Sequence, residues 1–84
     1  MQKNVFGLTA SGLPIPAYRF GDSGARVLIL GGVHGDEIEG VWGTFGLLKA
    51  FSDNFPYRLQ VTLVPMFNLD GVLARERRNS RGVD

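Results

Sequence analysis

The stretch that decides the fold is residues 26–37, which read RVLILGGVHGDE. Its first five residues, 26–30, consist of an arginine and four consecutive apolar residues ahead of two glycines, a pattern typical of a strand covered on both faces of a sheet. After the glycines, from Glu37 or Ile38 to Phe51, apolar residues recur at helical spacing instead. The change of period predicts a strand followed directly by a helix.

The predicted helix carries one broad apolar stripe, made of Ile38, Val41, Trp42, Phe45, Leu48 and Phe51. Asp36 is well placed to cap its first turn. Gly40, Gly43 and Gly46 stand three residues apart, and each interior glycine costs about 1 kcal/mol relative to alanine. Such a row is tolerated where a helix lies very close to a sheet, so we expect close packing along it.

Two short strands are predicted ahead of this unit, at residues 3–9 and 15–20. Pro14 and Pro16 each remove a backbone donor, so we expect the second of these strands to lie at a sheet edge. Residues 57–64 alternate between apolar and polar side chains and predict a further strand, whereas residues 68–84 show no apolar period and predict a loop. Strand, helix and strand in this order indicate an α/β fold with a mixed sheet.

Composition narrows the class of protein. The 84 residues allow one domain at most, and 44% hydrophobic with 20% charged residues is ordinary for a soluble globular chain. A net charge of +1 favours neither nucleic acid nor membrane as a partner, and the absence of cysteine excludes disulfides and thiolate zinc sites. With no apolar run near the ~20 residues of a membrane span and no secretory signal, we expect a cytoplasmic protein.

His34, the only histidine, precedes Glu37 by three residues at the end of the predicted strand. An imidazole nitrogen and a carboxylate oxygen at this spacing can bind one zinc ion. The alternative is a polar turn in which His34 and Asp36 only cap backbone groups. Asp36 and Glu39 are alternative candidates for the second ligand. Asp36 fits better as the helix cap, and Glu39 fits better as a solvent-facing residue.

The predicted loop has two features. Residues 68–71, Asn-Leu-Asp-Gly, have the pattern of a turn in which glycine takes positive φ. Further on, four arginines crowd seven residues, at positions 75, 77, 78 and 81. One interpretation is a solvated basic patch or an RNA contact, although no aromatic residue stands among the arginines to stack on bases. The other is that their guanidinium groups bind a carboxylate or a developing oxyanion.

Three segments together resemble the zinc carboxypeptidase family: residues 30–37, LGGVHGDE; residues 68–71, NLDG; and residues 77–84, RRNSRGVD. Their order and spacing fit the N-terminal part of a single zinc peptidase catalytic domain with an α/β/α architecture. The His-Gly-Asp-Glu sequence in the first segment and the compact Arg-x-Asn-x-x-Gly-Val-Asp pattern of the third look most like the corresponding motifs of the bacterial murein peptide amidase branch. The succinylglutamate desuccinylase and aspartoacylase branch is also similar around the zinc motif.

The resemblance implies a role for several residues. His34 and Glu37 match the first two ligands of one Zn²⁺ ion. Arg77, with Arg78 as the alternative register, matches the arginine that polarises the scissile carbonyl, and Asn79 is expected to contact substrate. The third zinc ligand, the general base and the Asn-Arg pair that grips the substrate carboxylate have no match in these residues. Leu69 stands where the family usually has proline.

The expected function is therefore zinc-dependent hydrolysis of an amide bond in a small peptide. The first choice of substrate is a cell-wall peptide containing the γ-D-glutamyl–diaminopimelate bond. The alternatives are N-acyl amino acid deacylation and a non-catalytic α/β module. Because two ligands hold zinc poorly, we expect the 84 residues alone to be inactive.

Overall fold

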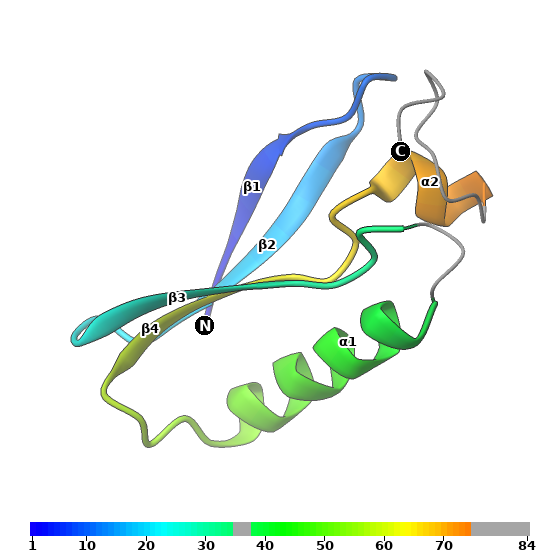
Figure 1. Cartoon of the computed structure of the whole chain (residues 1–84). Coiled ribbons are helices and arrows are strands. Elements are labelled where there is room, and N and C mark those ends of the chain that lie inside the picture. The colour runs from blue at the N-terminus through cyan, green and yellow to red at the C-terminus, as the bar shows by residue number, and fades with distance from the viewer. Residues whose placement is uncertain (35–37, 75–84) are drawn as a thin grey trace.

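The computed structural model describes residues 1–34 and 38–74. Within these residues the element order is β1 (Gln2–Leu8), β2 (Pro14–Phe20), β3 (Ala25–Leu30), α1 (Ile38–Asp53), β4 (Leu59–Val64) and α2 (Leu69–Ala74). The strands form one mixed sheet in the order β1-β2-β4-β3, and α1 links the parallel pair β3 and β4 (Figure 1). The predicted α/β class and the strand–helix–strand unit are confirmed.

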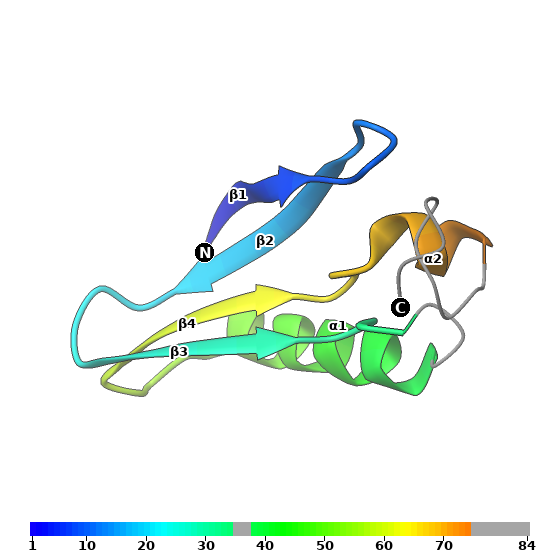
Figure 2. The same ribbon diagram turned by 45° about the horizontal axis from the view of Figure 1, so that its top comes forward.

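The strand directions bring four segments to one end of the sheet. Leu30 pairs with Val64 at the carboxyl ends of β3 and β4. Because β2 runs antiparallel to β4, with Tyr18 opposite Leu63, the start of β2 and the β1–β2 turn lie toward this same end. Figures 1 and 2 show α2 there as well, next to the ends of β3 and β4. In open α/β sheets such carboxyl ends are where ligands bind.

Each face of the sheet has its own hydrophobic cluster. On the face covered by α1, Phe20, Val61 and Leu63 are buried and pack with partly buried side chains that include Leu48 and Phe51. The second cluster consists of Ile15, Ala17, Val64 and Leu69, with Met66 and Phe67 packed against it. Side chains alternate along a strand, so the neighbours Leu63 and Val64 belong to opposite faces.

Strand β3 is less covered than its apolar run predicts. It lies at the edge of the sheet, where Leu28 is 53% exposed and Leu30 is 38% exposed. Val27 and Ile29, on the alternate face, pack into the cluster beneath α1. The prediction of a strand covered on both faces is therefore wrong for the described residues, because α1 covers only one face of β3.

Helix α1 confirms part of the predicted stripe, because Val41 is buried and Leu48 and Phe51 pack against the cluster on the sheet. Val41 and Thr44 are its buried residues, whereas Trp42 is 71% exposed. A helical turn of ~3.6 residues places positions 41, 44, 48 and 51 on one side and turns Trp42 away from it. Of the three glycines, Gly40 alone makes the expected close approach, because a side chain at Gly43 or Gly46 would meet nothing within 4 Å.

The prolines of β2 do not place that strand at the sheet edge. Strand β2 lies between β1 and β4, so the edge prediction is wrong. However, β4 pairs only with residues 18–20 of β2, whereas β1 pairs with β2 from Pro14 to Arg19, Pro16 included. The prolines thus occupy the half of β2 that has a single neighbour, where a missing backbone donor is tolerated.

The segment after β4 is not the predicted loop throughout. Residues 69–74 form α2, and Gly71 lies inside this helix rather than at a positive φ. The turn pattern of residues 68–71 predicts a helix start equally well, because asparagine is a strong N-cap residue. The rest of the predicted loop, residues 75–84, lies outside the described residues.

Candidate functional site

Backbone hydrogen bonds place residue 68 beside the segment that leads to His34. The amide of Gly31 donates to the carbonyl of Val64 at 2.9 Å, and the amide of Phe67 donates to the carbonyl of Gly31 at 2.9 Å. The amide of Asn68 then donates to the carbonyl of Gly32 at 3.0 Å. The β3–β4 pairing thus continues beyond both strands and holds the two connecting segments side by side.

The packing of the described residues leaves no room for a side chain at Gly31 or Gly32. A Cβ at Gly31 would collide with the Thr44 hydroxyl and with the carbonyl oxygens of Gly40 and Pro65. Gly32 has a φ of 64°, and a Cβ there would lie 2.9 Å from Val41 Cγ2. The space beside both residues is filled by α1 and by the segment after β4. The two glycines therefore allow the helix to approach the strand end closely.

A cavity of about 300 Å³ lies at this end of the sheet and is lined by Leu8, Thr9, Ala10, Ile15, Val33, His34, Phe67, Asn68, Leu69 and Asp70. His34 is half-buried in its wall. The volume is at the lower end of the roughly 300–1,000 Å³ typical of small-molecule sites. Three chain segments that are distant in sequence thus meet around the only imidazole of the protein.

Helix α2 begins at the cavity wall, where Asn68 caps its first turn. The side-chain Oδ1 of Asn68 accepts a hydrogen bond from the amide of Gly71 at 3.2 Å, as an N-cap residue does. Leu69 is then the first helical residue, the position at which proline is favoured. The difference between Leu69 and the proline expected from the family therefore leaves the start of the helix in place.

Asp70 is the buried acidic group of the site, with 8% of its surface exposed. Its Oδ1 accepts a hydrogen bond from the hydroxyl of Ser11 at 2.6 Å, and its Oδ2 accepts one from the amide of Ser11 at 3.2 Å. This carboxylate joins α2 to the turn between β1 and β2. The sequence pattern predicts Asp70 only as a turn residue and does not point to Ser11 or Thr9, since nothing local in the sequence shows that the hairpin returns to the site.

Among the predicted site residues, the structure places His34 at the cavity. Glu37, Arg77, Arg78 and Asn79, together with the proposed cap Asp36, lie outside the described residues. Glu39 is solvent-exposed in the first turn of α1, as expected. Residues 1–34 and 38–74 contain no cluster of three His, Cys, Asp or Glu side chains that would hold a metal ion. The imidazole of His34 at a cavity wall is the part of the proposed zinc site that the structure describes, and it suits zinc chemically.

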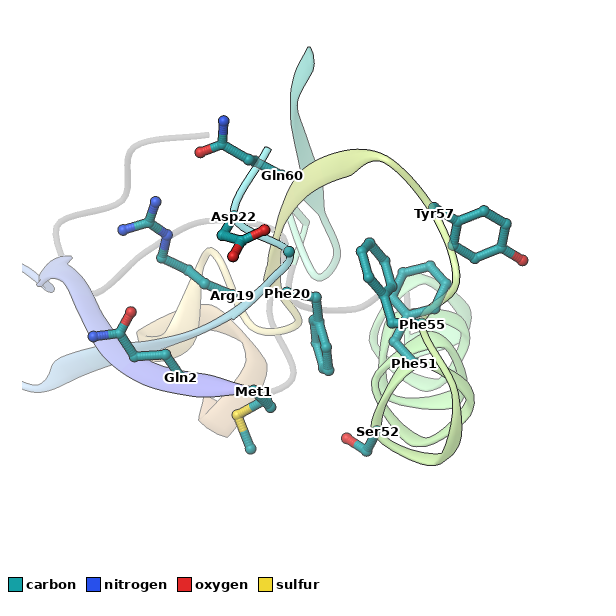
Figure 3. Close-up of a pocket in the computed structure, with 11 residues that line it drawn as sticks. Met1, Gln2, Arg19, Phe20, Asp22, Phe51, Ser52, Phe55, Tyr57 and Gln60 are labelled. Carbon is teal, nitrogen blue, oxygen red and sulfur yellow. The ribbon is translucent and has the colours of Figure 1, made fainter. Parts of the chain in front are cut away.

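A second, larger cavity of about 870 Å³ lies at the other end of the sheet, where β2 ends and β4 begins. Figure 3 shows Phe20 between Met1 and Gln2 on one side and the rings of Phe51 and Phe55 on the other. The centroids of the Phe51 and Phe55 rings lie 5.0 Å apart in an edge-to-face arrangement, which is favourable for aromatic pairs. No histidine lines this cavity, so the smaller one is the candidate site.

Comparison with protein families identifies the chain. The model of the succinylglutamate desuccinylase/aspartoacylase catalytic domain matches residues 23–83, which is more than half of the sequence. The chain belongs to this family. The matched range includes β3, α1, β4 and α2, and with them His34, Glu37, Arg77 and Asn79. The family belongs to the zinc carboxypeptidase-like fold and is generally zinc-dependent, which confirms the family resemblance.

Three solved structures show the same fold. A succinylglutamate desuccinylase/aspartoacylase from Rhodobacter sphaeroides is 27% identical over 82% of this chain, with a TM-score of 0.69. The product-bound ectoine utilization protein EutE (DoeB) from Ruegeria pomeroyi is 26% identical over 82% of the chain, also with a TM-score of 0.69. A succinylglutamate desuccinylase/aspartoacylase family protein from Shewanella amazonensis is 28% identical over 99% of the chain, with a TM-score of 0.67.

The chain spans only 21% of the first two structures and 26% of the third. A search of the curated proteins found no match. Neither helix in the described residues has the length and hydrophobicity that crossing a membrane requires.

Proposed function

We propose that this chain supplies the first part of the active site of a zinc-dependent hydrolase that cleaves an amide bond in a small acidic substrate. The observation that carries the proposal is the position of His34, half-buried in a cavity at the carboxyl ends of β3 and β4, within the region that matches a hydrolase family. Because the chain spans about a quarter or less of the matched structures, the remaining groups of the site are assigned to a longer catalytic domain.

His34 and Glu37 would hold the ion, one through nitrogen and one through oxygen, and a third ligand would come from outside these residues. When bound, zinc supplies Lewis acidity that activates water and polarises the scissile carbonyl. The fixed fork of the Arg77 guanidinium would bind the developing oxyanion, and Asn79 would bind the substrate. The cavity wall made by Val33 and Phe67 would limit access of bulk water.

For the substrate we favour an N-acylated amino acid, because the matched family and two of the similar structures carry the names of enzymes acting on succinylglutamate and N-acyl aspartate. The second candidate is a cell-wall peptide with a γ-D-glutamyl–diaminopimelate bond. It rests on residues 77–84, whose compact RRNSRGVD form resembles the murein peptide amidase branch. Both candidates present an amide bond next to a free carboxylate. A cytoplasmic location suits either of them and is part of the proposal.

The test uses the longest natural protein that carries these residues, loaded with Zn²⁺. We expect one zinc per chain, with loss of most of the bound metal in His34→Ala and an unchanged content in the control Asp53→Ala, a substitution at the exposed far end of α1. Zinc that remains bound stoichiometrically in His34→Ala would show that His34 is not a ligand.

Hydrolysis assays then separate the substrate classes. N-succinyl-glutamate and N-acetyl-aspartate represent the first class, and a γ-D-glutamyl–diaminopimelate peptide represents the second. We expect kcat/KM to be highest for an N-acyl amino acid and to fall by at least ~100-fold in Arg77→Ala, as expected when an oxyanion donor is removed. Preference for the cell-wall peptide would reverse the choice of substrate, and zinc binding without hydrolysis of either class would favour a non-catalytic module.

A further inference from the structure

The turn between β1 and β2, residues 9–13, is a closed loop with its own hydrogen bonds. The amide of Thr9 donates to the carbonyl of Leu13 at 2.8 Å, and the amide of Leu13 donates to the Thr9 hydroxyl at 3.0 Å. Gly12, with a φ of 90°, donates its amide to the carbonyl of Thr9 at 3.0 Å. These bonds tie the two ends of the loop to each other and define its shape.

Ser11 connects this loop to the opposite wall of the site. Its hydroxyl and its amide donate to the two oxygens of Asp70, at 2.6 Å and 3.2 Å. Hydrogen bonds to a carboxylate are among the stronger polar contacts in proteins. Asp70 is buried, but Ser11 is exposed, so a change at Ser11 removes the contact without disturbing a hydrophobic cluster.

The loop and its flanks form part of the cavity that contains His34. Leu8, Thr9 and Ala10 line it from the hairpin, and Asn68, Leu69 and Asp70 line it from the start of α2. The contact between Ser11 and Asp70 joins these two walls at the hairpin tip, whereas the buried cluster of Ile15 and Leu69 joins them nearer the sheet. Outside this contact, Phe6 on β1 reaches Phe67 with ring centroids 5.9 Å apart, which supports the hairpin farther from its tip.

We propose that Ser11 is a positioning residue that fixes the width of the His34 cavity by holding the hairpin tip on Asp70, and that the hairpin wall thereby selects the size of the acyl group accepted there. This inference rests on the proposed function and adds a determinant of substrate choice to it. Ser11 acts through Asp70 and the wall, and it takes no part in the bond cleavage.

The test compares three variants of the zinc-loaded, full-length protein. Ser11→Ala removes the hydroxyl contact, Ser11→Thr retains a hydroxyl, and Ser23→Ala is the matched control in the exposed turn between β2 and β3. The substrates are one amino acid carrying an N-formyl, N-acetyl or N-succinyl group. We expect Ser11→Ala to change the succinyl-to-formyl ratio of kcat/KM by about tenfold, the value of one hydrogen bond to a charged group.

The change should arise in KM for the larger acyl group, with kcat for the formyl substrate close to wild type. Ser11→Thr and Ser23→Ala should retain the wild-type ratio. Equal loss on all three substrates in Ser11→Ala, or an unchanged ratio, would overturn the inference while the proposed hydrolase function stands.

Amide hydrogen exchange on the full-length protein gives a readout that does not depend on catalysis. In Ser11→Ala the backbone amide of residue 11 keeps its own bond to Asp70 but loses the support of the hydroxyl, so we expect its exchange to accelerate about tenfold, while exchange at Leu63 in the centre of the sheet stays unchanged. Unchanged exchange at Ser11 would show that the contact does not hold the hairpin tip and would overturn the inference. Absence of acyl hydrolysis by the wild-type protein would instead overturn the proposed function, and the acyl-size role with it.

Discussion

The amide of Asn68 donates a hydrogen bond to the carbonyl of Gly32 at 3.0 Å, and this contact joins the start of α2 to the segment that carries His34. Asn68 also caps α2 through its side chain, which accepts from the amide of Gly71. One residue therefore fixes both the position of α2 and the direction in which it begins. The geometry of the cavity wall depends on this residue.

We expect Asn68→Ala to lower the free energy of unfolding by about 1 kcal/mol, because the amide of Gly71 loses its capping partner. Asn68→Asp retains a capping oxygen and should recover most of the loss. Urea denaturation followed by circular dichroism measures both effects. Asn54→Ala, at an exposed position after α1, is the control and should change stability by less than about 0.5 kcal/mol. Equal losses in Asn68→Ala and Asn54→Ala would show that the cap contributes nothing.

Two glycine substitutions are predicted to have opposite signs. Gly31→Ala places a methyl group against the Thr44 hydroxyl and the Gly40 carbonyl, so we expect destabilisation of about 1–3 kcal/mol. Gly43→Ala meets nothing within 4 Å in the middle of α1 and should stabilise the protein by about 0.5–1 kcal/mol. Thermal unfolding of the two variants measures both. Destabilisation by Gly43→Ala would contradict the open surroundings of that residue.

These glycines show how far the sequence alone predicts this fold. The run RVLILGG correctly indicates a strand that ends just before Gly31, because consecutive apolar residues followed by glycine have few other structures available. It does not show whether one or both faces are covered, since a covered and an uncovered apolar side chain look the same in the sequence. Leu28 and Leu30 are therefore more exposed than the prediction implies.

Among the described residues that line the candidate site, the sequence identifies one functional residue, His34. His34 could be identified because a lone histidine between glycines at a strand end is chemically distinctive, and the strand direction places it at the ligand-binding end. Ser11 and Asp70 could not be identified, because their contact depends on the packing of the hairpin against α2 across most of the chain. The positions of Glu37, Arg77 and Asn79 in the site stay predictions.

Trp42 gives a direct optical test of the orientation of α1. It is the only tryptophan, it belongs to the predicted apolar stripe, and its side chain is 71% exposed. We expect its fluorescence maximum to lie near that of free tryptophan, and acrylamide to quench it almost as efficiently in the folded as in the unfolded chain. A blue-shifted, poorly quenched emission would indicate that a partner or another copy of the chain covers this face of the helix.

The two leucines Leu63 and Leu28 test where the hydrophobic core lies. Leu63 is fully buried on β4, on the sheet face beneath α1, so Leu63→Ala should lower the free energy of unfolding by about 2–5 kcal/mol through lost burial and the cavity left behind. Leu28 is 53% exposed on the edge strand, and Leu28→Ala should cost about 1 kcal/mol or less because little apolar surface returns to water.

Urea unfolding of the wild type and of both leucine variants measures the two losses in the free energy of unfolding. The dependence of this free energy on urea concentration is compared among the three proteins. Because small chains bury little surface, Leu63→Ala is expected to leave only a minor fraction folded at 37 °C. Comparable losses at the two positions would mean that the outer face of β3 is covered in solution. That result would place a contact surface, for the rest of the longer domain or for a partner, at the edge of the sheet next to the segment that leads to His34.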